Sequence, residues 1–253
     1  MSNSLSWQCI FDDYDILKHD FSVAPYHISA EQIKKSTAHL DKTSQKEVRI
    51  LAKQDTRESI PQIFVDNNLF LLPTTNGKYA IIQGEGYVDI PKIETQTTLY
   101  KSKLEFELES SKIGNSEMQH LDFAYAVSMV RTFMDDCSLV LTIRGRKYTP
   151  EFEFLVGDHK QTLKVHNAQT EVDGYEGRDK MVLIGAKNSI TTNTLISQMY
   201  YPFKQWSSNV AKDVLLVLFE KQDEVYNFWE FTFTDPNDYN SIKILRSQSF
   251  IVK

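Results

Sequence analysis

Residues 170–187 read TEVDGYEGRDKMVLIGAK, and this stretch decides how the chain folds. The pattern predicts a strand, a tight glycine-containing turn over 174–179, and a second, apolar strand over 180–187. We expect the two strands to pair across the turn, which makes this hairpin the centre of a larger sheet.

Side chains two residues apart in a strand lie on the same face, so this hairpin predicts two polar pairs. Glu171 and Asp173 share a face of the first strand, and Gly185 and Lys187 share a face of the second. With the strands paired, Asp173 and Lys187 are expected to meet beside a hydrated metal ion. There the lysine could orient a water or stabilise charge on a phosphate.

The segments around the hairpin predict an α/β (α+β) fold with a mixed central sheet flanked by helices. Ser116 is a good N-cap for a helix that ends at Asp135-Asp136, and its apolar residues follow helical spacing. A second helix is expected over 192–205. Further strands are predicted at 99–108, 137–143, 152–156, 161–166, 214–219, 226–234 and 249–252.

Residues 1–92 have a different texture and predict a separate N-terminal region, with 93–253 forming the second domain. Ser29 and Gln32 have the spacing of a capping box, and further short helices are expected at 45–53 and before Pro61. A hairpin follows, turning at Asn76-Gly77. Helices followed by a hairpin are typical of a winged helix-turn-helix, and segment 31–57 carries seven basic and four acidic residues. A small α+β packing domain is the alternative.

Composition narrows the class of protein. The chain has 253 residues and a formal net charge of −6, which argues against coating nucleic acid by charge alone. Its two cysteines and six histidines have no zinc-site spacing, and a reducing cytoplasm is the expected setting. The longest apolar run, VLLVLF at 214–219, is too short to cross a membrane, and the N-terminus lacks the pattern of a secretory signal.

The stretch that contains Asp173 and Lys187 resembles the PD-(D/E)XK nuclease superfamily, in particular type II restriction endonucleases. Asp173 matches the first acid of that motif, and Gly185-Ala186-Lys187 stands where the superfamily usually has Glu-Ala-Lys. The following segment, with Gln198 and Tyr201, is similar to the glutamine-tyrosine helix of several branches. The resemblance covers about residues 112–220 and implies Mg²⁺ as cofactor. It also implies an auxiliary acid in the preceding helix, where Glu117 lies.

Gly185 departs from the motif because glycine has no side chain that could bind a metal. Either Glu171 or Glu176 supplies the missing ligand, or this copy is inactive. The resemblance therefore implies catalytic roles for Asp173, Lys187, Glu117 and the position of Gly185. It makes Asp173 and Glu171 the expected metal ligands.

The leading hypothesis is a Mg²⁺-dependent endonuclease that acts on specific double-stranded DNA as a homodimer. Two alternatives stay open, a non-catalytic DNA-binding protein on the same scaffold and an interaction module without a nucleic-acid role. The candidate DNA contacts are polar or basic side chains: Lys34, Lys35, Arg49, Arg57, Arg144, Arg146, Lys147 and Gln198.

Overall fold

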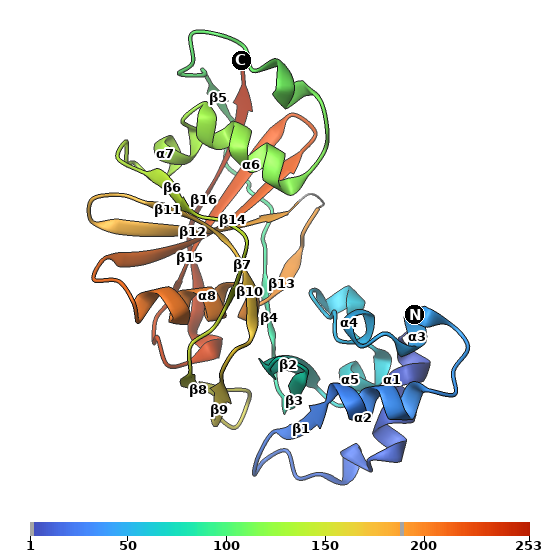
Figure 1. Ribbon diagram of the computed structural model, residues 1–253. Helices are drawn as coiled ribbons and strands as arrows, with labels where there is room; N and C mark the ends of the chain where they lie inside the picture. The colour runs from blue at the N-terminus through green and yellow to red at the C-terminus, as the bar shows by residue number, and fades with distance from the viewer. Residues whose placement is uncertain (1–2, 188–189) are drawn as a thin grey trace.

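The computed structural model describes residues 3–187 and 190–253 (Figure 1). The N-terminal part carries a small antiparallel sheet in the strand order β1-β3-β2, covered by short helices. Its elements are α1 (Ser4–Asp13), β1 (Tyr26–Ser29), α2 (Ala30–Thr37), α3 (Thr43–Lys46), α4 (Val48–Leu51), α5 (Gln62–Asp66), β2 (Leu69–Thr75) and β3 (Lys78–Gln83), with 3₁₀ turns at Ile16–Lys18 and Arg57–Ser59.

Two local predictions for this part are confirmed. The Ser29 hydroxyl accepts from the Gln32 backbone N–H at 3.2 Å, and the Gln32 side chain accepts from the Ser29 N–H at 2.9 Å, so α2 begins at a true capping box. Gly77 has a φ of +74°, as the two-residue turn between β2 and β3 requires. The helix expected at 45–53 is instead two single turns, because the backbone at Glu47 is extended.

The C-terminal part is built on a seven-stranded mixed sheet in the order β5-β16-β15-β14-β12-β11-β6, which confirms the predicted α+β class. Three smaller strand pairs, β4–β13, β7–β10 and β8–β9, lie around it. The strands are β4 (Tyr87–Asp89), β5 (Thr98–Tyr100), β6 (Val140–Ile143), β7 (Arg146–Tyr148), β8 (Phe152–Val156), β9 (Gln161–Val165), β10 (Gln169–Glu171), β11 (Asp173–Glu176), β12 (Lys180–Lys187), β13 (Asn193–Leu195), β14 (Asp213–Gln222), β15 (Val225–Phe233) and β16 (Ile242–Val252). The helices are α6 (Glu117–Ala126), α7 (Met129–Phe133) and α8 (Ser197–Ser207), with 3₁₀ turns at Glu109–Lys112 and Tyr239–Ser241.

Helices cover both faces of this sheet (Figure 1). One apolar core lies between the sheet and α6 with α7, and it includes Val182 and Ile184 of β12. The other core lies between the sheet and α8, and it includes Met181 and Leu183. Alternate residues of β12 therefore face opposite helices, as the pleat of a strand requires.

Four predicted elements of the C-terminal part differ from the structure. The helix predicted at 192–205 starts only at Ser197, because Asn193–Leu195 pairs with β4 as strand β13. The helix predicted to run to Asp136 is interrupted at Ser128, whose φ of +66° ends α6 and starts α7 in a new direction. The strand predicted at 99–108 pairs only at Thr98–Tyr100. In the central hairpin the turn lies at 177–179 instead of 174–179. Gly174 belongs to the strand, where an added Cβ would lie 2.6 Å from Ile143 Cδ1, so this glycine permits close packing.

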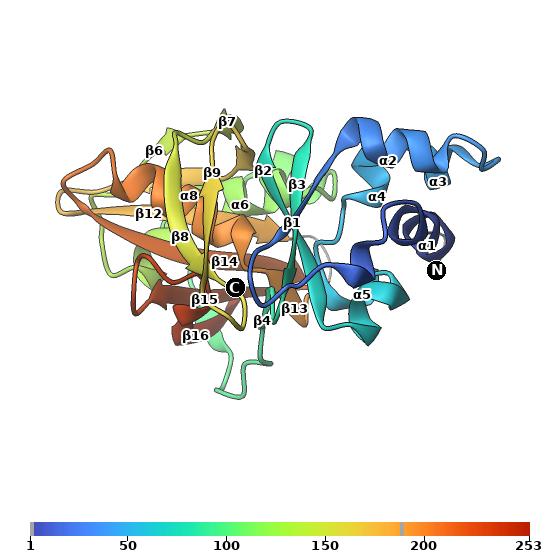
Figure 2. The same ribbon diagram turned by 90° about the horizontal axis from the view of Figure 1, so that it is seen from below.

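The β2–β3 hairpin lies between the two parts, and its two faces pack into different cores (Figure 2). Leu71 and Ile81 face the N-terminal core, together with Trp7 and Phe64 of the helices. Leu72 and Ile82, one residue further on each strand, face the core of the C-terminal part. Among the described residues, no helix is both long and apolar enough to cross a membrane.

Candidate functional site

Asp173 lies at the start of β11 and is almost buried, with an exposure of 8%. Its Oδ2 lies 3.3 Å from Arg144 Nη1, and the same guanidinium also pairs with Asp122 of α6. Burial raises the pKa of the Asp173 carboxyl, and the positive charge of Arg144 only partly opposes this shift. The arrangement brings two carboxylates and one guanidinium together on the α6 face of the sheet.

Tyr175 follows on the same face of β11, two residues after Asp173. Its ring packs against that of Tyr125 with a centroid distance of 4.9 Å. The hydroxyl is buried and has no hydrogen-bond partner among the described residues. Burial raises the pKa of this phenol, and the charges of Arg144, Asp173 and Asp122 all act on it. A buried polar group without a partner among the described residues thus lies on the same face of the sheet as Asp173.

Lys187, at the end of β12, belongs to a different cluster. Its Nζ donates to Gln198 Oε1 of α8 at 2.7 Å. The same oxygen accepts from Thr194 Oγ1 at 3.2 Å. The predicted proximity of Lys187 and Gln198 is therefore present, on the α8 face of the sheet.

The expected meeting of Asp173 and Lys187 is wrong, because the two side chains lie on opposite faces. Asp173 pairs with Ile184, and residues paired across an antiparallel ladder share a face, here the α6 face. Lys187 is three residues beyond Ile184 and faces α8. The cause is the parity of the register, since Asp173 pairs with Ile184 and shares a face with every second residue of β12 from there, whereas Lys187 is an odd number of positions away.

Gly185 lies on the same face as Lys187, and there is room beside it. An added Cβ would meet Leu218 Cδ1 at 3.9 Å, an ordinary contact distance. The parallel neighbour of Lys187 on β14 is Glu220, which is 3% exposed and accepts from the Thr191 N–H at 2.9 Å. The carboxylate beside the lysine is thus Glu220, which was not among the predicted site residues. Its signal was an acid at the end of the apolar run of β14.

Burial raises the pKa of the Glu220 carboxyl, and this makes a stability prediction. The folded protein disfavours the ionised form, so the penalty is present above the folded pKa and disappears as pH falls through it. Glu220→Gln keeps an acceptor for the Thr191 N–H and is expected to raise the melting temperature at pH 7. Thermal melts between pH 7 and pH 4 should show the difference shrinking; a variant that is less stable at pH 7 would contradict the assignment.

The remaining predicted acids lie apart from one another. Glu171 is exposed and lies 3.4 Å from Arg146 Nε. Glu176 pairs with Lys212 at 2.5 Å, near the turn end of the hairpin. Glu117 is exposed in the first turn of α6, and the acid of α6 that reaches the Arg144 cluster is Asp122. Within the described ranges no three His, Cys, Asp or Glu residues are grouped to hold a metal.

The predicted DNA contacts fall into two sets. Lys34, Lys35 and Arg49 are exposed on the N-terminal helices. The others are engaged within the protein, since Arg144 and Arg146 pair with acids and Lys147 Nζ donates to the Arg144 carbonyl at 3.2 Å.

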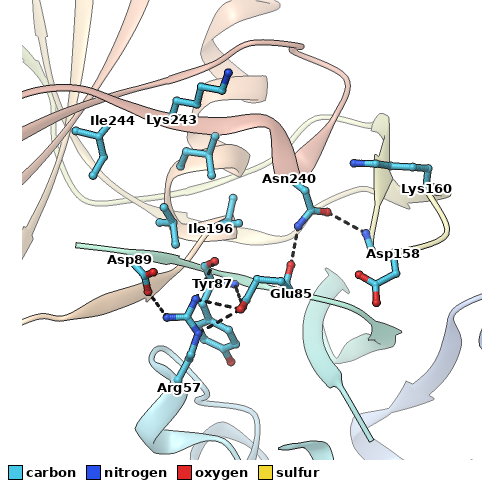
Figure 3. A pocket seen from close by; sticks show the side chains of 13 residues that line it. Arg57, Glu85, Tyr87, Asp89, Asp158, Lys160, Ile196, Asn240, Lys243 and Ile244 are labelled. Carbon is cyan, nitrogen blue, oxygen red and sulfur yellow. Dashed lines mark hydrogen bonds and ion pairs between the residues drawn. The ribbon is translucent and has the colours of Figure 1, made fainter. Parts of the chain in front are cut away.

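Arg57 lines an open groove of about 870 Å³ where the N-terminal part meets β4 and the start of β16 (Figure 3). Its guanidinium pairs with Asp89 at 2.5 Å and with Glu85 at 3.0 Å. Next to it, Asn193 Nδ2 donates to Glu58 Oε1 at 2.9 Å. Arg57 therefore joins the two parts of the chain.

Comparison with known proteins assigns no function. No curated protein matches the sequence. No solved structure matches it either. A family model described as a domain of unknown function, DUF6996, matches residues 4–81. Residues 82–251, two thirds of the chain, match a second model, and the protein therefore belongs to the family of the domain of unknown function DUF6997.

Proposed function

We propose that this chain is a restriction-endonuclease-like protein that binds specific double-stranded DNA and hydrolyses its phosphodiester bonds with Mg²⁺. The observation that carries the proposal is the order α6-β6-β11-β12-α8-β14. In it β6, β11 and β12 pair antiparallel, and β14 joins β12 in parallel after α8. Asp173 starts one strand of this core and Lys187 ends the next, which agrees with the resemblance of the motif.

The residues around Asp173 fit a small divalent cation. Mg²⁺ binds one or two carboxylates and completes its coordination shell with waters and phosphate oxygens. Asp173 supplies a buried carboxylate, whose pKa is raised by desolvation. When bound there, the ion would polarise the scissile phosphate and activate a water. Lys187, held by Gln198, presents a positive charge on the other face, where it would contact the DNA backbone.

The N-terminal part supports DNA binding by its topology and its exposed charge. The order helix, strand, helices and hairpin, with β1 paired to β3, is compatible with a winged-helix reading of this region. Lys34 and Lys35 lie exposed in the last turn of α2. We propose that these two lysines contact DNA phosphates and that the protein dimerises to match a palindromic site. We also propose that it works in the cytoplasm, where its two free cysteines stay reduced.

A non-catalytic DNA-binding protein is the second candidate. Two observations favour it: Gly185 offers no carboxylate, and Asp173 and Lys187 lie on opposite faces of the sheet. DNA binding in EDTA without cleavage in Mg²⁺ would identify this second candidate, and cleavage in Mg²⁺ would identify the first. An interaction module without a nucleic-acid role would show neither.

Duplex DNA binding is expected to weaken steeply with salt and to depend on Lys34 and Lys35. Each phosphate contact contributes about one unit to the slope of log K against log salt, so the Lys34→Ala/Lys35→Ala variant should lower that slope by about two. Fluorescence anisotropy with a random-sequence duplex at several salt concentrations measures it. Lys18→Ala is the control, since Lys18 is exposed on the same part of the chain but paired with Asp15. Affinity that does not change with salt would contradict phosphate binding.

A further inference from the structure

Two carboxylates from segments that are distant in sequence pair with a single arginine side chain in this protein. Asp122 comes from α6 and Asp173 from β11, and Arg144, just after β6, pairs with both. The Asp173 side chain is 10% exposed, the Arg144 side chain 30% and the Asp122 side chain 52%. The guanidinium therefore pairs with a buried and a half-exposed carboxylate at a place that remains open to solvent on the Asp122 side.

A second and independent observation comes from Tyr175. Its hydroxyl is buried without a partner among the described residues, although buried polar groups nearly always have one. Tyr175 follows Asp173 by two residues on β11, so its side chain lies on the same face of the sheet as the Asp173 carboxylate. A water carried by a cation between the carboxylates would give the hydroxyl its missing partner.

We infer that Asp122 and Asp173 form a divalent-cation site that Arg144 closes while no cation is bound. The arginine pairs with both carboxylates, and a cation that enters must displace it. A displaced guanidinium is suited to a DNA phosphate, with which it forms charge-assisted bidentate hydrogen bonds. DNA would therefore favour metal loading by drawing Arg144 away, which couples the two binding events.

The inference rests on the metal role proposed for Asp173 but does not require cleavage. Asp122 takes the place expected for Glu117 or Glu171 as the second acid, because it contacts the same guanidinium as Asp173. Glu171 lies next to Arg146 instead, and the exposed ion pair of Lys164 with Glu151 offers a control elsewhere on the surface.

Mn²⁺ binding to the full chain without DNA tests the inference, with the free ion followed by electron paramagnetic resonance. Arg144→Gln removes the competing charge and is expected to tighten Mn²⁺ binding at least about tenfold, whereas Lys164→Gln, which breaks an exposed ion pair with Glu151, should leave it unchanged. Asp122→Asn and Asp173→Asn, each combined with Arg144→Gln, should abolish the gain. A short random duplex added to the unsubstituted protein should also tighten Mn²⁺ binding.

Binding that is no tighter in Arg144→Gln, or that survives Asp122→Asn, would overturn the inference. If Arg144→Gln does not fold, Arg144→Lys replaces it, because a single ammonium cannot bridge both carboxylates and should give a smaller gain in the same direction. Cleavage assays keep the two proposals apart. Tight Mn²⁺ binding without cleavage supports the cation site and contradicts the nuclease, and cleavage that is insensitive to Asp122→Asn does the reverse.

Discussion

Asp173→Asn is expected to lower the rate of Mg²⁺-dependent DNA cleavage by about a thousandfold or more, equivalent to about 4 kcal/mol of transition-state stabilisation. The physical reason is that the amide keeps the shape of the side chain but loses the charge that would hold the cation. DNA affinity in EDTA should not fall, because the substitution removes a negative charge and leaves the proposed phosphate contacts at Lys34, Lys35 and Lys187 in place. Single-turnover cleavage of a plasmid substrate measures the first effect and a gel shift the second.

The matched control for this variant is Asp179→Asn. Asp179 belongs to the same hairpin but is exposed in its turn, so its replacement should leave cleavage within about twofold of the unsubstituted protein. Folding should survive Asp173→Asn, since burial raises the pKa of this carboxyl and the neutral amide avoids the cost of desolvation. Equal cleavage by both variants would remove Asp173 from the site.

Trp7→Ala is expected to destabilise the N-terminal part by about 3–5 kcal/mol. Trp7 is fully buried in α1, and its ring packs edge-on against Phe64 of α5 with a centroid distance of 4.8 Å. Its Nε1 donates to the Leu51 carbonyl at 3.0 Å, so the substitution also leaves that oxygen without its partner. Urea unfolding followed by far-UV circular dichroism gives the change in free energy of unfolding.

Leu5→Ala provides the comparison for Trp7→Ala. Leu5 lies in the same helix but is 52% exposed, and its replacement is expected to change the free energy of unfolding by less than about 0.5 kcal/mol. A large effect at Leu5, or a small one at Trp7, would mean that the N-terminal core is not centred on this tryptophan. DNA affinity should likewise fall in Trp7→Ala and stay unchanged in Leu5→Ala, since α2, which carries Lys34 and Lys35, packs on that core.

Features that depend on neighbours in sequence could be predicted well. The capping box at Ser29 and the turn at Asn76-Gly77 each depend on residues within four positions, and both are present. The N-cap of α6 is present as well, because the Ser116 hydroxyl accepts from the Gln119 N–H at 3.2 Å. Local hydrogen bonds of this kind are specified by residue type alone.

Features that depend on distant contacts could not be predicted in the same way. Gly174 was predicted to lie in the turn. Ile143, thirty-one positions earlier in the sequence, packs against it, and Gly174 lies within β11 instead. The turn therefore lies at 177–179, and the register that follows sets Asp173 opposite Ile184, on the other face from Lys187. Asp122 was not identified for a related reason, since only the packing of α6 against β11 shows which acid of the helix meets Arg144.

The shared β2–β3 hairpin has a consequence for how the chain can be divided. The two family models meet between Ile81 and Ile82, in the middle of β3. An expression fragment cut at that point would split a strand whose side chains alternate between the two cores, leaving apolar surface open on both products. In this chain we therefore expect the two matched segments to unfold as a single cooperative unit, so heat or denaturant should melt them together.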